Sequence, residues 1–399
     1  MSVRQETGEK YMRLAIELAR KGEGYTNPNP MVGAVIVKDG KVIAGGYHHR
    51  YGDLHAERDS LKNFSEGIFE DELKKLCVSE DIPFNEKAAG HAGTEGLIED
   101  ATMYVTLEPC CHTGKQPPCT EAIVEAGIKH VVIGSRDPNP LVHGKGVAFL
   151  RDHGVEVTED FLRDECDALN PVFFKYISEK IPYVVLKYAM TADGKIATAT
   201  GESKWITGED ARFEVQRMRH RYMAIMAGIG TVLADDPMLN VRIEGLKSPV
   251  RVICDSRLRV PVESNIVRTA KDIRTIVVYA DGDLSKQKAL SECGVELMNV
   301  PGIDGRVDVA ALIKKLGESG IDSVFVEGGG TLNDSLRAAG LIDRVECFVA
   351  PKIFGGADAK SPVEGTGIGS IGDAPELILE DVRRIGDDVL LTYVRNKMK

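Results

Sequence analysis

The sequence has no long hydrophobic run. Nowhere in its 399 residues is there a stretch of about 18 uncharged apolar residues, which is the least that a membrane-spanning helix needs. The amino-terminal stretch MSVRQETGEKYMRLAIELARKG also lacks the unbroken apolar core of a signal peptide. It follows a helical period instead, with Met12, Ala15, Ile16 and Ala19 on one face. We therefore expect a cytoplasmic protein with no membrane partner.

Runs of basic residues are lacking as well. The formal net charge is −11, and Lys and Arg are not clustered anywhere along the chain. Broad contact with a nucleic-acid backbone needs clustered cations, so we expect no nucleic-acid partner. A small phosphorylated ligand needs only two or three cations and stays compatible with this composition.

Cysteines are few, and their distribution is uneven. Eight in 399 residues is too low a density for a disulfide framework, so we expect a reducing compartment. Three of them, Cys110, Cys111 and Cys119, lie within ten residues in the segment PCCHTGKQPPC. Such clustering favours a metal or catalytic site over bridges. We interpret the other five as small packed hydrophobic residues.

The length predicts two domains, because a single core seldom grows to this size. Strands and helices alternate over residues 1–160, where Asp39-Gly40 between two β-rich runs predicts a hairpin. A second alternation fills residues 182–399, and residues 161–181 are predicted to be a connecting helix and linker. Residues 65–98 are acidic and weakly periodic. We interpret them as a loop-like surface excursion, in which Cys77 and His91 are incidental.

The clustered cysteines and the upstream HAE segment suggest a catalytic zinc site. Catalytic zinc uses three protein ligands and keeps one position open for water. His55, Cys110 and Cys119 offer one imidazole and two thiolates. Glu57 lies about 200° around a helix from His55, which is awkward for joint ligation. At the first turn of a helix, however, both side chains can border one pocket, with Glu57 as the proton shuttle.

Alternatives to this ligand set remain open at this point. Cys111 is nearer to Cys110 than Cys119 is, but adjacent cysteines seldom both bind one ion. A structural zinc site would need His112 or Cys111 as its fourth ligand, and a disulfide is the least favoured interpretation. The spacing C-x8-C also departs from the P-C-x-x-C element of zinc deaminases in general.

Four segments resemble the deaminase half of the RibD family of bifunctional riboflavin-biosynthesis proteins: NPNPMVGAVIVKDG, GYHHRYGDLHAE, YVTLEPCCHTGKQPPC and SRDPNPLVHGKG. The longer cysteine spacing is normal in that family, although residues 65–98 exceed its usual connection. The resemblance implies a cytidine-deaminase-like three-layer α/β/α domain over residues 1–160. It places zinc on His55, Cys110 and Cys119 and the catalytic proton shuttle on Glu57. It places Asn29, His48, His112 and Lys115 on the substrate side.

The second half lacks a G-x-G-x-x-G segment after its first predicted strand, so a Rossmann fingerprint is absent. It has SVFVEGGGTLNDSL instead, in which a strand enters three glycines and a helix begins near Thr331. Backbone N–H groups at such a turn make a phosphate cradle. A plain tight turn explains the same pattern equally well.

Further segments resemble the reductase half of the same family, namely KYAMTADGKIA, GESKWIT, GTVLADDPMLNVR and VEGGGTLNDSL. The resemblance implies a dihydrofolate-reductase-like α/β domain over residues 182–399 that uses NADPH. The cofactor side falls on Ala189, Trp205, Thr231, Asp235, Ser256, Gly329, Gly330, Thr331, Leu332, Asn333, Asp334 and Ser335. The substrate side falls on Ser203, Arg219, Leu239, Arg242 and Glu327, and its two arginines suit a ribose phosphate.

Several of these positions also have purely structural interpretations. Trp205 could fill a core, Arg219 could lie on a solvated helix face, and Asp235 could belong to a turn. Lys187 and Asp193 lie near the expected cofactor, but the sequence assigns neither a role in proton transfer.

The resemblance as a whole implies two successive steps of riboflavin synthesis. The first is zinc-dependent hydrolytic deamination of 2,5-diamino-6-(5-phosphoribosylamino)pyrimidin-4-one. The second is NADPH-dependent reduction of the ribosyl chain of 5-amino-6-(5-phosphoribosylamino)uracil to ribityl. We also expect a homo-oligomer.

Two rival functions remain. One is an RNA or tRNA deaminase with an accessory domain, which the acidic charge opposes. The other is a non-enzymatic, zinc-stabilised nucleotide-binding protein, which Glu57 opposes because a structural site needs no carboxylate beside its ligands.

Overall fold

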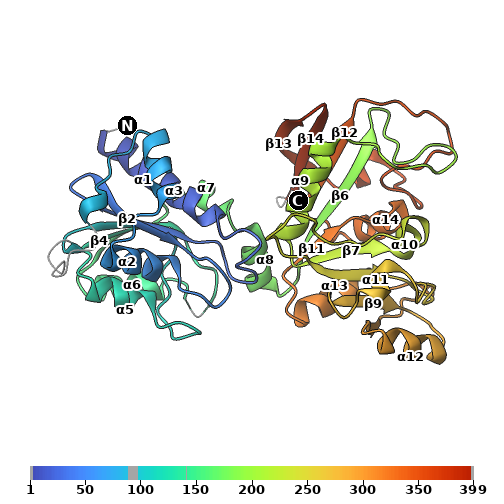
Figure 1. Cartoon of the computed structure of the whole chain (residues 1–399), viewed down its shortest axis with the longest axis horizontal. Helices are drawn as coiled ribbons and strands as arrows, with labels where there is room; N and C mark the ends of the chain where they lie inside the picture. The colour runs from blue at the N-terminus through green and yellow to red at the C-terminus, as the bar shows by residue number, and fades with distance from the viewer. Residues whose placement is uncertain (1–2, 89–97, 141, 397–399) are drawn as a thin grey trace. The chain divides into compact units, whose positions relative to one another are not determined.

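The computed structural model describes residues 3–88, 98–140 and 142–396, and it divides into two compact units, Met1–Glu179 and Lys180–Lys399 (Figure 1). His91, which the sequence analysis interpreted as incidental, lies outside the described residues. Within the described ranges, every helix is too short or too polar to cross a membrane.

The first unit is built on a five-stranded sheet of order β2-β1-β3-β4-β5. β1 pairs antiparallel with β2 and β3, whereas β3, β4 and β5 are parallel. Its elements are α1 Val3–Arg20, β1 Gly33–Lys38, β2 Lys41–Tyr47, α2 Ala56–Glu66, α3 Asp71–Ser79, the 3₁₀ turn η1 Glu86–Ala88, β3 Thr102–Leu107, α5 Cys119–Glu125, β4 His130–Ser135, α6 Lys145–Asp152, β5 Glu156–Thr158, α7 Arg163–Asp167 and α8 Pro171–Glu179.

The turn between β1 and β2 is the predicted hairpin. Asp39 and Gly40 both have positive φ, 50° and 71°, as a two-residue hairpin of type I′ requires. Aspartate and glycine tolerate that left-handed region, so these two residues fix the register that pairs Lys38 with Lys41.

Alternate residues of the strands enter two separate cores, so the first unit has three layers. Ala34 and Ile36 of β1 pack into a core with α2, α5 and α6. Val35 and Val37 point to the other face and pack against α1 and α3. Figure 1 shows these two groups of helices on opposite faces of the sheet. The predicted apolar face of α1 is buried, and the three-layer α/β/α arrangement is confirmed.

Two segments are more ordered than the sequence suggested. Residues 71–79, predicted as part of a loop, form α3, and Leu73 and Cys77 are buried beneath α1. The loop interpretation was wrong there because these two apolar residues, one helical turn apart, are enough to bury one face of a short acidic helix. In the segment predicted as a linker, Cys166 and Phe173 are buried in the cores of the first unit.

The second unit is built on a nine-stranded sheet of order β10-β9-β8-β7-β11-β6-β12-β14-β13. The strands from β10 to β12 are parallel, and β14 and β13 add antiparallel pairs. Its elements are β6 Tyr183–Thr191, α9 Glu209–Arg221, β7 Ala224–Gly228, α10 Ile229–Asp235, β8 Val250–Cys254, α11 Asn265–Arg268, β9 Thr275–Tyr279, α12 Leu284–Glu292, β10 Glu296–Asn299, α13 Val309–Glu318, β11 Ser323–Val326, α14 Gly330–Ala338, β12 Arg344–Ala350, the 3₁₀ turn η2 Ile371–Asp373, β13 Leu377–Ile385 and β14 Asp388–Arg395.

The parallel strands of the second unit are buried on both faces. Val252 of β8 packs in a core with α13 and α14, while its neighbour Ile253 packs in another with α10, α11 and α12. Because β7, β8 and β11 are parallel neighbours, the loops at their carboxyl ends meet at one edge of the sheet, where open α/β sheets bind ligands.

Candidate active sites

Three side chains of the first unit converge as a metal site requires. The ligand atoms of His55, Cys110 and Cys119 all lie within 4.8 Å of one another. Nδ1 of His55 is 3.4 Å from each of the two sulfur atoms. Among the described residues Cys111 is not part of this group, which favours Cys119 as the third ligand. Three ligands that include thiols suit zinc and leave a fourth position for water.

Local structure explains how residues 64 positions apart come together. His55 caps the amino end of α2 in an extended conformation, and Cys119 is the first residue of α5. Arg58, one turn into α2, donates hydrogen bonds to the carbonyls of Pro117 (3.0 Å) and Pro118 (2.6 Å). Arg58 therefore clamps the proline-rich loop against the helix that carries His55. The sequence analysis missed Arg58, and only its place directly after HAE hinted at it.

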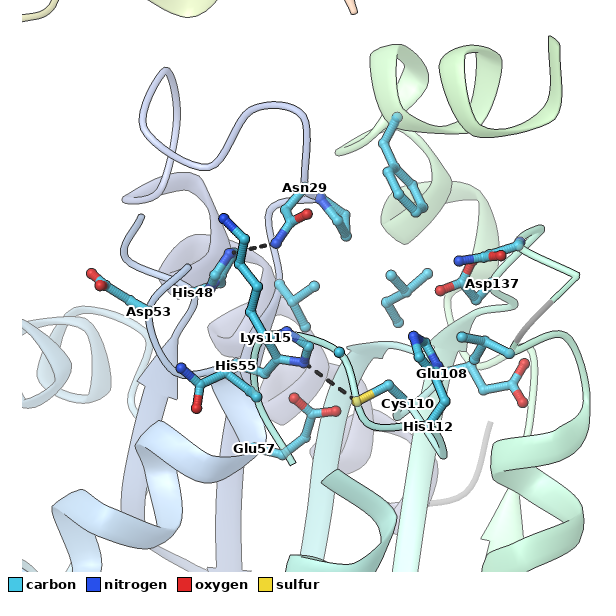
Figure 2. Close-up of a pocket in the computed structure, with 18 of the residues that line it drawn as sticks. Asn29, His48, Asp53, His55, Glu57, Glu108, Cys110, His112, Lys115 and Asp137 are labelled. Atoms are coloured by element: carbon cyan, nitrogen blue, oxygen red, sulfur yellow. Dashed lines mark hydrogen bonds between the residues drawn. The ribbon is translucent and has the colours of Figure 1, made fainter. Parts of the chain in front are cut away.

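Glu57 is buried beside this group. Its side chain is 3% exposed, and Figure 2 shows its carboxylate next to the His55 ring and the Cys110 sulfur. The two residues border one pocket because His55 is outside the helix, in extended backbone, so the 200° separation of helical residues does not apply. Burial raises the pKa of Glu57 to about 7, a value suited to proton transfer near neutral pH.

The two thiols differ in their acidity. A hydrogen bond from the Cys119 thiol, together with the nearby His55, lowers the pKa of Cys110. The same hydrogen bond to Cys110 and its own burial raise the pKa of Cys119. A bound cation would replace the proton that the pair shares, since metals bind the thiolate form.

One wall of the pocket carries Asn29 and His48, as Figure 2 shows. Nδ1 of His48 lies 2.9 Å from the Leu54 carbonyl, which only accepts, so Nδ1 carries the proton. Nε2 then accepts from the side-chain amide of Asn29 at 3.3 Å. Burial lowers the pKa of His48, which keeps the ring neutral. The Asn29 carbonyl oxygen therefore remains free of this pair and able to accept from a ligand.

His112 and Lys115 reach the pocket from the proline-rich loop. Nδ1 of His112 is buried and has no hydrogen-bond partner among the described residues. The Lys115 ammonium lies 3.8 Å from the centre of the Tyr51 ring, which holds this cation at the pocket. The Lys115 ammonium is therefore placed to meet a polar ligand, and the His112 ring borders the same pocket.

The structure adds pocket residues that the sequence analysis did not select. Glu108 accepts hydrogen bonds from the backbone N–H groups of Gly144, Gly146 and Val147 and so fixes the chain just before Cys110. Burial raises the pKa of Asp137 to about 6. Asp137 lies in SRDPNP, within one of the segments that resemble the deaminase half of the RibD family. The added lining residues with polar side chains are Asp53, Glu108, Gln116, Asp137 and Asn139.

The second unit has a larger pocket, of about 760 Å³, at the carboxyl ends of β7, β8 and β11. Nine of the residues selected from the sequence line it: Ser203, Thr231, Asp235, Ser256, Gly329, Gly330, Thr331, Leu332 and Ser335. A volume of this order accommodates an extended cofactor.

The glycine run borders this pocket. Gly329 caps α14 with φ −82° and ψ 168°, and a Cβ atom placed on it would meet nothing within 4 Å. A Cβ on Gly330, by contrast, would lie 2.4 Å from the Glu364 side chain. Gly329 therefore leaves open space beside the amino end of α14, as a phosphate cradle requires.

Three charged side chains form a buried group outside this lining. Arg219 pairs with Glu327 through Nε (2.6 Å) and Nη2 (3.0 Å), and the Lys187 ammonium lies 4.0 Å from the same carboxylate. Burial alone would raise the pKa of Glu327, but the two cations hold it below its usual value. Burial lowers the pKa of Lys187.

The other selected residues lie outside the pocket lining. Asn333 is buried and donates to the Pro362 carbonyl at 2.7 Å, and Asp334 pairs with Arg337 at 2.6 Å. These two side chains hold the fold, so we expect any contact with a cofactor there to come from the backbone. The remaining selected residues that do not line the pocket are Ala189, Trp205, Leu239 and Arg242.

Comparison with known proteins gives consistent matches over both units. Residues 5–135 match the family described as the cytidine and deoxycytidylate deaminase zinc-binding region, and residues 182–391 match the RibD C-terminal domain. The riboflavin biosynthesis protein RibD of Actinobacillus pleuropneumoniae is 50% identical, over 98% of this chain and 96% of its own. The corresponding protein of Escherichia coli K12 is 36% identical, over 97% and 99%.

Solved structures agree with these matches. Acinetobacter baumannii RibD superposes with a TM-score of 0.81 at 35% identity, covering 98% of this chain and 100% of that one. A diaminohydroxyphosphoribosylaminopyrimidine deaminase/5-amino-6-(5-phosphoribosylamino)uracil reductase from Thermotoga maritima superposes with a TM-score of 0.80 at 36% identity and the same coverage.

Proposed function

Because the chain belongs to the RibD family of bifunctional riboflavin-biosynthesis enzymes, with a deaminase domain followed by a reductase domain, we propose that the two pockets described above are its two active sites. The deaminase domain is assigned to residues 1–160 and the reductase domain to residues 182–399. The observation that carries the proposal is the convergence of His55, Cys110 and Cys119 beside the buried Glu57.

In the deaminase, we assign zinc to His55, Cys110 and Cys119. Zinc bound there would lower the pKa of a water molecule at the open position and so supply the nucleophile. Glu57 would accept the proton that the attacking water loses and would deliver it to the amino group that leaves as ammonia. Its buried position beside the ligand atoms and its pKa near neutrality support both halves of this transfer.

The substrate contacts follow from the groups that the pocket leaves free. A diaminopyrimidine presents N–H donors along its edge, and the Asn29 carbonyl is free to pair with such an edge, while the His112 ring lines the same pocket. Lys115 provides a cation for the phosphate of the ribose arm. Nε2 of His48 is already paired with the Asn29 amide, so we assign His48 the role of orienting Asn29 and not that of contacting the pyrimidine edge.

In the reductase, we assign the larger pocket to NADPH, which supplies the hydride. Backbone N–H groups at the amino end of α14, from Gly329, Gly330 and Thr331, would receive the pyrophosphate.

On the substrate side, three N–H groups of Arg219 already donate to Glu327 and to the Asn240 carbonyl. The guanidinium of Arg242 makes no ion pair or hydrogen bond within the described ranges, so we assign the substrate phosphate chiefly to Arg242.

Substitution of Gly329 by Val tests the phosphate cradle. The β-region backbone of Gly329 accepts a β-branched residue, and the new side chain would point into open space of the pocket. We therefore expect a folded enzyme whose KM for NADPH rises by about tenfold or more, with deamination unchanged. Steady-state kinetics of both reactions measure this.

The matched control for that variant is Gly369→Val. Gly369 also has open space around a Cβ atom, but it does not line the pocket. The KM of the Gly369→Val enzyme for NADPH should therefore stay at the wild-type value. A normal KM in Gly329→Val would show that the pyrophosphate lies elsewhere. Gly330 is unsuited to this test because its substitution would displace Glu364.

Substitution of Arg242 by Ala tests the other side of the reductase site. Removal of a cation that pairs with a phosphate should raise the KM for the pyrimidine nucleotide by about tenfold to a hundredfold and leave that for NADPH unchanged. Kinetics with each ligand varied in turn separate the two. Loss of NADPH binding with normal substrate affinity would reverse the assignment.

We further propose that the chain works as a homo-oligomer in the cytoplasm. β13 is the last strand of the nine-stranded sheet, and its residues Leu377, Ile378, Leu379 and Val382 are 40–55% exposed. An apolar edge strand of this kind is a surface that a second copy can cover. The proposed thiolate ligands need a reducing compartment, which supports the cytoplasmic location.

Incubation with the diaminopyrimidine nucleotide, with and without NADPH, tests the function directly. Mass spectrometry should detect the deaminated nucleotide and ammonia without NADPH, and the ribityl product when NADPH is added. An unchanged substrate would refute the proposal. Similarity along both units, rather than along the deaminase unit alone, favours this function over an RNA deaminase or a non-enzymatic binding protein.

A further inference from the structure

Asp193, which the sequence places near the expected cofactor, takes no part in the two sites described above. It lies just after β6, in the turn TADG of residues 191–194, where the Gly194 N–H donates to the Thr191 carbonyl at 2.9 Å and Gly194 has a φ of 77°. In the described structure Asp193 is not among the residues that line the larger pocket. Any contribution to the reductase must therefore act through another part of the chain.

The Asp193 carboxylate is surrounded by hydrogen-bond donors. One oxygen accepts from the Thr191 hydroxyl (2.5 Å) and from the Phe354 N–H (3.1 Å), and the other accepts from the Gly355 N–H (2.7 Å). Successive backbone N–H groups that point at one anion form a nest for it. The hydrogen bonds from the Thr191 hydroxyl and from this backbone lower the pKa of Asp193 to about 2. The side chain is therefore an ionised acceptor near neutral pH and has no proton to donate.

The two N–H groups belong to residues 352–364, which follow β12 and which we call the wall segment. Lys360 and Glu364 of the wall segment line the larger pocket. The end of the wall segment is joined to the glycine run, since the Glu364 N–H donates to the Gly330 carbonyl at 3.1 Å. The wall segment therefore runs from the turn that carries Asp193 to the proposed pyrophosphate cradle.

Asp193 makes the central attachment of the wall segment. Within the described residues, the two bonds to its carboxylate are the only hydrogen bonds that join residues 353–358 to a part of the chain outside the wall segment. The next attachments on either side are at the carbonyls of Lys352 (2.8 Å) and Ala359 (3.2 Å). Without the carboxylate, residues 353–358 would have no such attachment.

We propose that Asp193 is a positioning residue of the reductase, whose carboxylate fixes the wall segment and so keeps Lys360 and Glu364 in place at the cofactor pocket. This inference rests on the proposed function, and it gives Asp193 a role in cofactor binding and none in proton transfer. A pocket whose wall is in place for only part of the time binds its ligand more weakly by that fraction. Loss of the carboxylate should therefore raise the KM for NADPH and spare kcat.

The test uses the full-length protein with Asp193→Ala and Asp193→Asn. For Asp193→Ala we expect the KM for NADPH to rise about threefold to tenfold, with the kcat of the reductase within about twofold of the wild type and its pH profile unchanged. Asn keeps one acceptor oxygen but turns an N–H₂ group toward the other donors, so Asp193→Asn should give a smaller rise. Steady-state kinetics over a range of pH measure these quantities.

Hydrogen exchange followed by mass spectrometry, without cofactor, reports on the wall segment itself. The amides of residues 352–364 should exchange faster in Asp193→Ala than in the wild type, whereas those of β8 should not change, because the loosening is local. This local readout distinguishes loss of the attachment from a general loss of stability.

The matched control is Asp283→Ala. Asp283 also accepts from a hydroxyl and from two backbone N–H groups, at the amino end of α12, and it does not line the pocket. Its replacement should change neither the KM for NADPH nor the exchange of the wall segment.

A large fall in kcat with an unchanged KM would overturn the inference, because it would place Asp193 in the chemistry. An unchanged KM would overturn it even if the wall segment exchanges faster, since the segment would then have no bearing on the cofactor. In both cases a wild type that binds NADPH normally leaves the proposed cofactor site intact. A wild type that does not bind NADPH would refute the proposed site and this inference with it.

Discussion

Replacement of Glu57 by Gln should abolish most deamination while the protein keeps its zinc. Loss of a general acid/base typically lowers a rate by about 10²–10⁴-fold, and the amide of Gln cannot carry the proton. The shape of the buried site is preserved, and Glu57 is not among the converging ligand atoms. Ammonia release and metal content of the same sample measure both quantities.

The matched control is Glu66→Gln, which removes a carboxylate from the exposed end of the same helix. The deamination rate of Glu66→Gln should equal that of the wild type. The Glu57→Gln variant should also reduce the deaminated intermediate normally when this is supplied, because the reductase pocket is lined only by residues of the second unit. Near-normal ammonia release from Glu57→Gln would refute the role of this residue.

Replacement of Cys119 by Ser should empty the metal site. Cys119 is fully buried against His55 and Cys110, and a serine hydroxyl at that position is a far weaker zinc ligand than a thiolate. We expect bound zinc to fall from about one ion per chain to near zero after mild chelation, and deamination to fall with it. Metal analysis by mass spectrometry measures the loss.

Cys111→Ser is the control for that experiment. It makes the same chemical change next to Cys110, but Cys111 is outside the converging group in the described structure. We expect full zinc content and normal deamination. If Cys111→Ser loses the metal and Cys119→Ser retains it, the ligand assignment is wrong.

The sequence indicated the residues of the proposed metal site more completely than the residues that hold its walls in place. His55, Glu57, Cys110 and Cys119 are recognisable because each sits in a short segment whose residue types already suit zinc and proton transfer. Arg58 and Glu108 could not be found in that way. Their partners, the Pro117 carbonyl and the backbone of residues 144–147, are set by how α2, α5 and α6 pack.

In the secondary structure too, features set by short segments were predicted, and a feature set by packing was not. Strands and helices with strong periodicity, and the Asp39-Gly40 hairpin, follow from local preferences and were predicted correctly. Helix α3 was missed because only Leu73 and Cys77 mark its buried face, and a pattern of two residues becomes visible only when a partner such as α1 covers it.

By itself, the sequence determined the α/β class, and it indicated the proposed metal ligands, the proposed proton shuttle and the glycine run, because each of these lies in a short segment whose residue types carry the signal. Only the tertiary structure decided which distant residues share a pocket. Arg219 meets Glu327 across 108 positions, and Ser256 meets Val307 across 51. The physical reason is that side-chain periodicity encodes which face of a strand is buried, whereas the order of strands in a sheet arises from non-local pairing that no local pattern specifies.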